Sequence, residues 1–337
     1  MHNPVPRRAA LKTIASSIGS FGLASALPGM AVAQDAAGYP AKSVTYIVPF
    51  TPGGSTDVIG RALTQKLSER LGQPFVVDNK PGAAGAVGAG IVARAKPDGY
   101  TLFGGTISTH AINASLYKNL PYDPIKDFEP VCLVAMLPNV LIVDPKLGVN
   151  SVAELVALLK RDPSKRNFAS SGAGTSTHLA GEMFADLIGV KLDHIPYKGT
   201  PPAMMDVSSG LVTFMFDQMT AASALVAGGK LKLLAVTTGK RIALAPQLPT
   251  MIESGIAGFE MSSWQAVYAP KGTPKAIVNK LNNEIVAILA LPDVKDKLVT
   301  QLGMEIVASS PEQLAAHMAK EIPRWGALVQ KSGAKAD

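Results

Sequence analysis

Glycines and hydroxyl-bearing residues follow directly after a buried apolar run near the start of the chain. The stretch P-F-T-P-G-G-S-T-D, residues 49–57, stands between V-T-Y-I-V and a segment with helical spacing. Glycine lets the backbone approach a ligand closely, and free backbone N–H groups at a helix start bind anions. The stretch therefore indicates an anion-binding turn. Tight turning alone, with helix capping by Ser55, Thr56 and Asp57, would also account for it.

A second turn of similar composition follows another apolar run. The stretch S-S-G-A-G-T-S-T-H, residues 170–178, precedes a further helical segment. In an open parallel sheet such turns lie at the carboxyl ends of strands, where ligands bind. Two turns of this kind could hold one carboxylate-bearing molecule from opposite sides.

Enzymatic chemistry has weaker support in these motifs. G-T-S-T-H at residues 174–178 resembles the G-x-S-x-G turn of serine hydrolases, but His178 stands where the last glycine is needed. A pair of Ser176 and His178 would also need an orienting acid, which the sequence does not identify. The glycine-rich run at 82–90 lacks the phasing of a dinucleotide-binding motif. An exported hydrolase that uses Ser176 is the competing enzymatic hypothesis.

Composition argues against several other classes of protein. Aromatic residues make up only 6% of the 337-residue chain, which disfavours surfaces that stack bases or sugars. The one cysteine, Cys132, allows neither an intramolecular disulfide nor a cysteine metal cluster. His110 and His194 lack the spacing of a metal pair and a nearby third ligand. We expect no cofactor, no metal and no nucleic-acid partner.

The first 33 residues have the pattern of an export signal. Arg7, Arg8 and Lys12 precede a mildly apolar segment that ends in an A-x-A cleavage site at residues 31–33. The arginine pair favours the twin-arginine route, and an ordinary secretory signal fits about as well. Removal of this segment leaves 29 basic and 25 acidic residues, a net charge of +4. We expect a soluble periplasmic product, because the rest of the chain lacks the ~18 charge-free apolar residues of a membrane span.

Strands and helices alternate along the rest of the chain. Strands are expected at 44–48, 75–79, 100–103, 131–136, 140–143, 167–171, 193–197, 212–216, 232–236 and from 267. Helices are expected at 57–71, at 151–160 (with Ser151 as N-cap and Glu154 at the capping-box position), 179–187, 201–207, 274–289 and 311–325. A further helix that ends before Pro97 is expected to follow the glycine- and alanine-rich run at 81–90. Strands separated by helices imply a parallel sheet covered on both faces.

Eight stretches, taken in order, resemble the tripartite tricarboxylate transporter receptors, also called Bug proteins. They are P-F-T-P-G-G-S-T-D from residue 49, D-N-K-P-G-A-A-G from 78, K-P-D-G-Y-T-L from 96, G-T-S-T-H-L-A-G-E-M-F from 174, H-I-P-Y-K-G-T from 194, G-K-L-K-L-L-A-V from 229, L-P-T-M-I-E-S-G from 248 and W-Q-A-V-Y-A-P-K-G-T-P from 264. No single stretch is diagnostic, but the ordered series is specific and covers essentially the whole chain after residue 33.

The resemblance implies an α/β architecture, the two-domain type II fold of periplasmic binding proteins. Two lobes with parallel or mixed sheets would be joined by two crossing strands, with the ligand cleft between them. Lobe 1 would comprise residues 34–138 plus 264–337, and lobe 2 residues 139–263. The crossings would fall near Pro138 and at residues 264–265.

The resemblance also implies a function, that of an extracytoplasmic receptor without catalytic activity. Its ligand would be a small organic acid, captured between the lobes of a monomer. Its partners would be the membrane subunits of a tripartite tricarboxylate transporter, or a sensor protein in a signalling pathway. The sequence does not distinguish transport from signalling, and does not name the acid.

The resemblance implies a ligand site built from loops of both lobes, with ordered waters bridging some contacts. The expected ligand-binding residues are Phe50, Thr51, Pro52, Gly53, Gly54, Ser55, Asp57, Thr106, Ser108, Gly174, Thr175, Ser176, Thr177, His178, Tyr197 and Asp217. Structural roles compete at some of these positions. Asp57 could brace the helix turn, His178 could cap or pack, and Tyr197 could belong to the core.

Overall fold

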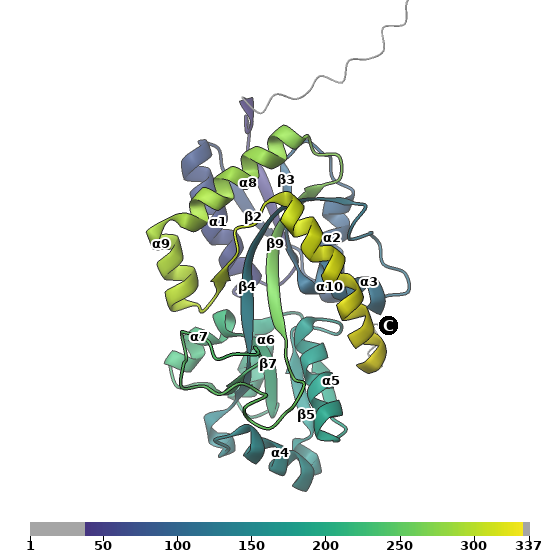
Figure 1. Cartoon of the computed structure of the whole chain (residues 1–337), viewed down its shortest axis with the longest axis vertical. Helices are drawn as coiled ribbons and strands as arrows, with labels where there is room; N and C mark the ends of the chain where they lie inside the picture. The colour runs from purple at the N-terminus through teal and green to yellow at the C-terminus, as the bar shows by residue number, and fades with distance from the viewer. Residues whose placement is uncertain (1–37, 333–337) are drawn as a thin grey trace, which may run out of the picture. The chain divides into compact units, whose positions relative to one another are not determined.

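Buried apolar runs form the strands of a ten-stranded mixed sheet in the computed structural model, which describes residues 38–332 (Figure 1). The segment 1–33, which has the pattern of an export signal, lies outside the described residues. Within the described part of the chain, no helix is long and apolar enough to cross a membrane.

Three parallel strands and their helices form what we call the first half of the sheet. β1 lies between β2 and β3 and pairs in parallel with both. Tyr46 and Val48 on β1 pack with Leu63, whereas Ile47 packs with Ala89, so helices cover both faces of the strand. The elements are β1 (Val44–Val48), α1 (Ser55–Leu71), β2 (Phe75–Asn79), η2 (Ala83–Gly85), α2 (Ala86–Ala93), β3 (Thr101–Thr106), the π-helical turn η3 (Ser108–Ile112) and α3 (Asn113–Leu116).

Two long strands, β4 (Phe128–Val143) and β9 (Ser262–Pro270), run side by side through the middle of the fold (Figure 1). β4 pairs with β9 as far as Pro138, and from Asn139 onward it pairs with β7 (Phe214–Gln218) and β8 (Lys232–Val236). The sequence predicted two strands around Pro138, whereas the structure has one continuous strand. Proline lacks the N–H of a sheet ladder, and Pro138 is tolerated because β4 changes partners at this point.

The second half of the sheet repeats the pattern of parallel strands and helices. β5 pairs in parallel with β6 and β7. The predicted N-cap is confirmed, because Ser151 Oγ accepts from the Glu154 N–H. The Glu154 carboxylate accepts from the Asn150 N–H, one residue before the N–H that a capping box uses. Besides β7 and β8, the elements are η4 (Pro145–Leu147), α4 (Val152–Arg161), η5 (Pro163–Lys165), β5 (Asn167–Ser170), α5 (Ser176–Ile188), β6 (Asp193–Pro196), α6 (Thr200–Ser208) and α7 (Met219–Ala227).

The chain returns to the first half through β9 and ends in helices. The elements that follow are α8 (Lys275–Ala290), α9 (Pro292–Lys295), the π-helical η6 (Asp296–Gln301), β10 (Glu305–Ile306) and α10 (Pro311–Ser332). The sequence predicted only α8 and α10 in this region. β10 pairs with β4 at Ala135 and Met136. The exact lobe boundaries stay predictions, although the change of β4 partners falls between Pro138 and Asn139.

One buried carboxylate ties α10 to β9. Glu321 Oε2 accepts hydrogen bonds of 2.9 Å from the indole N–H groups of Trp264 on β9 and Trp325 on α10. Glu321 is only 6% exposed, and Arg324 donates to its other oxygen. Because a buried N–H without an acceptor is costly, Glu321 fixes the position of Trp264 beside the crossing to the second half.

Replacing Glu321 with alanine should lower the free energy of unfolding by about 2–4 kcal/mol, since it leaves two buried indole N–H groups without an acceptor. Chemical unfolding followed by circular dichroism measures this change. Lys320→Ala is the matched control, because Lys320 is an exposed neighbour on the same helix. Its effect should stay below about 0.5 kcal/mol, and equal effects of the two substitutions would contradict the role of Glu321.

Candidate functional site

A small cavity lies where the two halves of the sheet meet. Its volume is about 40 Å³. A water molecule needs about 10–15 Å³ of such space, so the cavity accommodates a group of about three non-hydrogen atoms, the size of a carboxylate. The lining residues, most of which carry a hydroxyl group, are Phe50, Thr51, Gly54, Ser55, Thr56, Thr106, Ile107, Ser108, Ser171, Ser176, Thr200, Gln218, Ser263, Trp264 and Gln265.

Five helices in the described part of the chain begin at this cavity. The lining residues at their starts are Ser55 on α1, Ser108 on η3, Ser176 on α5, Thr200 on α6 and Gln218 before α7. The N–H groups in the first turn of a helix have no acceptor within the helix, and they carry the positive end of its dipole. Several helix starts that face one cavity therefore favour a bound anion.

Asp57 lies behind the cavity and holds the loop between β1 and α1, the first of the two glycine-rich turns. Its Oδ2 accepts from the Gly53 N–H at 3.0 Å and from Arg61 Nε at 2.9 Å, and its Oδ1 accepts from Asn79 Nδ2 at 3.0 Å. Burial opposes ionisation of Asp57, but these three hydrogen bonds outweigh it and lower the pKa of the carboxyl. Asp57 thus holds the glycine turn in place and does not line the cavity.

The hydroxyls of Ser55 and Thr56 do not cap α1, contrary to the capping role considered from the sequence. Gly54 occupies the N-cap position, without a side-chain hydrogen bond to the helix. Thr56 Oγ1 accepts from Gln265 Nε2 at 2.9 Å, and Ser55 Oγ lies 3.5 Å from Gln218 Oε1. Both hydroxyls therefore face residues across the cavity.

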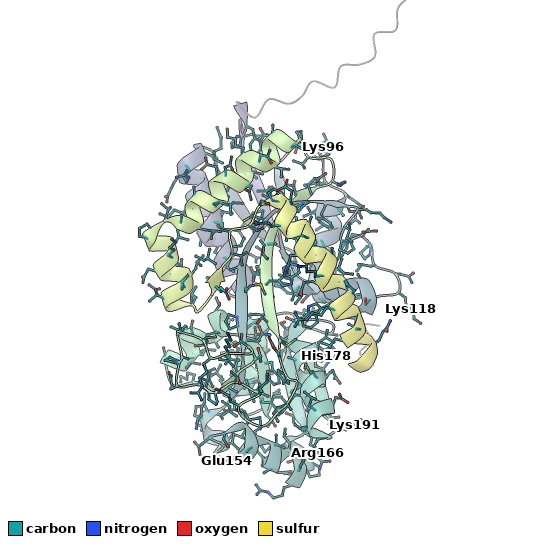
Figure 2. The ribbon with its side chains drawn as sticks, viewed as in Figure 1. Lys96, Lys118, Glu154, Arg166, His178 and Lys191 are labelled. Carbon is teal, nitrogen blue, oxygen red and sulfur yellow. The ribbon has the colours of Figure 1, made fainter. Side chains whose placement is uncertain are left out.

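The loop between β5 and α5, the second of the two glycine-rich turns, is held by Thr175 and His178. Figure 2 labels His178. Thr175 caps the helix, its hydroxyl accepting from the His178 N–H at 3.4 Å. His178 Nδ1 accepts from the Gly174 N–H at 3.1 Å, and His178 Nε2 lies 3.3 Å from Glu182 Oε1. His178 also stacks on His194, with ring centroids 3.8 Å apart. These contacts make His178 a support of the loop.

Hydrogen bonds join the two halves around the cavity. The Ser176 N–H donates to Ser108 Oγ at 3.2 Å, and the hydroxyls of Ser176 and Ser263 share a hydrogen bond of 3.2 Å. Thr51 and Gly199 lie so close that a Cβ atom on Gly199 would be 2.1 Å from Thr51 Oγ1. The halves are therefore in contact, in a closed arrangement.

Thr51 carries a buried hydroxyl that none of the described residues satisfies by a hydrogen bond. A buried hydroxyl in this condition costs about 1–3 kcal/mol. Because Thr51 lines the cavity, this hydroxyl is available to a ligand there.

Asp217 lies directly behind the cavity wall. None of the described residues that line the cavity carries a charge. Asp217 is fully buried, and its two oxygens accept from the Thr200 hydroxyl and the Gln218 N–H, each at 2.7 Å. Burial raises the pKa of Asp217 to about 7, although these hydrogen bonds oppose the rise. While Asp217 is ionised, it orients the Thr200 hydroxyl proton toward itself.

The structure brings several predicted site residues to the cavity wall and places others behind it. Those that line the wall are Phe50, Thr51, Gly54, Ser55, Thr106, Ser108 and Ser176. Those that do not are Pro52, Gly53, Asp57, Gly174, Thr175, Thr177, His178 and Asp217, while Tyr197 lines a neighbouring cavity. Their roles as ligand contacts stay predictions.

Sequence reasoning missed about half of the cavity wall. The missed residues are Thr56, Ile107, Ser171, Thr200, Gln218, Ser263, Trp264 and Gln265. The S-S-W-Q stretch from Ser262 could have been found from its hydroxyls beside a predicted crossing. Thr200 offered a signal too, because it follows a glycine at the start of a predicted helix.

The raised pKa of Asp217 predicts a pH-dependent stability. Because the folded state favours the protonated carboxyl, Asp217 should make the free energy of unfolding fall by a few kcal/mol as pH rises from about 4 to 7. Asp217→Asn should remove that part of the decline, as measured by urea unfolding at a series of pH values. Asp57→Asn should keep it, because the lowered pKa of Asp57 affects stability only at more acidic pH. An unchanged slope in Asp217→Asn would refute this assignment.

Comparison with known proteins agrees with this geometry. The profile described as "Tripartite tricarboxylate transporter family receptor" (TctC) matches residues 59–334. Protein BugT of Bordetella pertussis is 38% identical over 316 residues, covering 94% of this chain and 97% of BugT.

Two solved structures are similar over most of the fold. Periplasmic binding protein BugD is 40% identical, with a TM-score of 0.85, over 89% of this chain and 100% of BugD. Rpa4515 of R. palustris, solved with adipate, is 39% identical, with a TM-score of 0.85, over 88% of this chain and 99% of its own. The predicted fold of periplasmic binding proteins is confirmed, and this chain belongs to the tripartite tricarboxylate transporter receptor family.

Proposed function

We propose that this protein is an exported receptor that captures a small organic acid and delivers it to the membrane subunits of a tripartite tricarboxylate transporter. The observation that carries the proposal is the convergence of helix starts and hydroxyl groups on one small cavity. Neutral N–H and O–H donors of this kind suit a carboxylate. The adipate bound to the related Rpa4515 supports an organic acid as the ligand class.

The geometry supports binding by closure. The first-half donors, at Thr51 and the start of α1, replace water around one face of a carboxylate. Ser176 and Thr200 reach it from the second half when the halves close about β4 and β9. Closure then presents to a membrane partner a surface that the open form lacks.

Hydrolysis by Ser176 has little support in the geometry. His178 Nδ1 accepts from the Gly174 N–H, so the proton of a neutral His178 ring lies on Nε2, which faces Glu182. Ser176 Oγ instead bonds to Ser263 Oγ. A nucleophilic serine needs a base within hydrogen-bond reach, and His178 has its ring nitrogens engaged elsewhere.

Export, processing and oligomeric state belong to the same proposal. Residues 1–33 would be removed on export, leaving a monomeric periplasmic protein that begins at Gln34. The described residues 38–332 belong to one compact unit, which supports the use of residues 34–337 as the experimental protein.

A panel of carboxylates, amino acids, amines and sugars tests the function through the melting temperature of residues 34–337. One carboxylate class should raise the midpoint by several degrees. A ligand whose concentration is about 100 times its Kd stabilises the folded state by ~2.7 kcal/mol. The protein should first be unfolded, dialysed and refolded, to remove any acid that was purified with it. A response to sugars or amines alone would contradict the proposal.

Gly199→Ala should weaken binding of the identified acid at least tenfold, because its Cβ atom would displace Thr51 and hinder closure. Titration calorimetry measures the loss. Gly148→Ala is the matched control, since Gly148 also has positive φ (77°) but no other residue comes within 4 Å of the position that its Cβ atom would take. The control should lose some stability and keep its affinity within twofold. Comparable affinity losses in both variants would show that closure at Gly199 does not govern binding.

A further inference from the structure

Asp217 is a fully buried carboxylate directly behind the cavity wall. Its two oxygens accept from the Thr200 hydroxyl and from the Gln218 N–H, each at 2.7 Å. Neither donor carries a charge, and both residues line the cavity. Because an ionised carboxylate that is buried without a cation is costly, the protonated form of Asp217 is accessible near neutral pH.

Ionisable side chains on the neighbouring elements do not determine the charge of Asp217. The elements that pack against β7 are β4, β5, α5, α6 and α7, of which β5 and α7 carry no ionisable side chain. The ionisable residues on the other three are Glu129 and Cys132 on β4, His178, Glu182 and Asp186 on α5, and Asp206 on α6. The pKa of Asp217 depends instead on burial, which raises it, and on its own two hydrogen bonds, which lower it.

The Thr200 hydroxyl has a single proton, and the charge of Asp217 decides where that proton points. An ionised Asp217 can only accept, so the Thr200 proton is directed to its Oδ2. Thr200 then offers only oxygen lone pairs to the cavity, and these repel a carboxylate. A protonated Asp217 can donate to Thr200 instead. The Thr200 proton is then available to a carboxylate oxygen in the cavity.

Electrostatic repulsion acts in the same direction. A carboxylate in the cavity and an ionised Asp217 would be separated by one hydroxyl group, that of Thr200. None of the described lining residues carries a positive charge that could offset the two negative ones. Two carboxylates that share one site raise the pKa of one of them. A bound acid should therefore raise the pKa of Asp217 further above its value of about 7.

We propose that capture of a carboxylate is coupled to the uptake of one proton by Asp217, with the Thr200 hydroxyl between them. The proton comes from solvent, adds to an oxygen of Asp217 and returns to solvent when the acid leaves. The bound acid itself stays a carboxylate. This inference rests on the proposed function, because it assumes that the cavity holds a carboxylate. Binding should therefore weaken as pH rises above 7, although the acid keeps its charge.

Titration calorimetry on residues 34–337 counts the protons, because the heat of a proton-coupled binding step depends on the ionisation enthalpy of the buffer. Adipate and malate serve as probes, in HEPES and in Tris at pH 8, and in MES and in Bis-Tris at pH 6.5. At pH 8, where a group of pKa about 7 is about nine-tenths ionised, binding should take up about 0.6–0.9 proton. At pH 6.5 it should take up less than about 0.3 proton. The Kd should rise about five- to tenfold from pH 6.5 to pH 8.

Asp217→Asn should abolish the proton uptake, because an amide does not titrate in this range. Its Nδ2 group can donate to the Thr200 hydroxyl, as a protonated Asp217 does. The variant should therefore bind at pH 8 at least threefold more tightly than the unaltered protein, a gain that structural damage would not produce. Difference infrared spectra at pH 8, with adipate labelled with ¹³C at both carboxyl carbons, should show an unshifted protonated-carboxyl band on binding. Asp217→Asn should lack that band.

Asp144→Asn is the matched control, because Asp144 is another buried aspartate of the second half and does not line the cavity. It should keep the proton uptake and leave the affinity within twofold. A binding heat that does not depend on the buffer at pH 8, or proton uptake that persists in Asp217→Asn, would overturn the coupling while the carboxylate receptor stands. Absence of binding by any carboxylate of the melting panel would overturn the proposed function and the coupling with it.

Discussion

Unpaired N–H groups at helix starts are the feature on which the binding account depends. A helix cannot satisfy these donors itself, so side chains, water or a ligand must supply acceptors. α1 begins at Gly54 without a side-chain cap. At the start of α5, the Thr175 hydroxyl accepts from the His178 N–H and Ser108 Oγ accepts from the Ser176 N–H. A carboxylate between the two helices would provide acceptors for the remaining donors. Neutral donors also avoid the desolvation cost of burying an arginine or lysine.

The two helix starts meet because β4 runs through both halves of the sheet, and β9 returns beside it to the first half. The partner change of β4 at Pro138 places the parallel strands of the second half opposite those of the first. Trp264 on β9 lines the cavity and is anchored by Glu321 on α10. The C-terminal helix thereby helps to position a wall of the site, although it contributes no residue to the described lining.

Local features of the fold and site could be predicted, whereas long-range ones could not. The turns after β1 and β5 follow from glycines and hydroxyls that end apolar runs, so the cavity walls at Thr51 and Ser176 were accessible from the sequence. Gln218 reaches the cavity only through the pairing of β7 with β4, which leaves no local signal. Helix α7 was missed because its sequence, M-T-A-A-S-A-L-V-A, has too few polar residues to mark a helical face. Asp57 was ambiguous because a bracing role and a ligand contact require the same residue type.

A crystal structure of residues 34–337 with a bound carboxylate would test the central claim most directly. The account predicts that the oxygens of one carboxylate lie about 2.7–3.2 Å from N–H groups at the starts of both α1 and α5, with Thr51 Oγ1 also in contact. If every carboxylate oxygen instead paired with lysine or arginine side chains, and none with a helix start, the account would be contradicted.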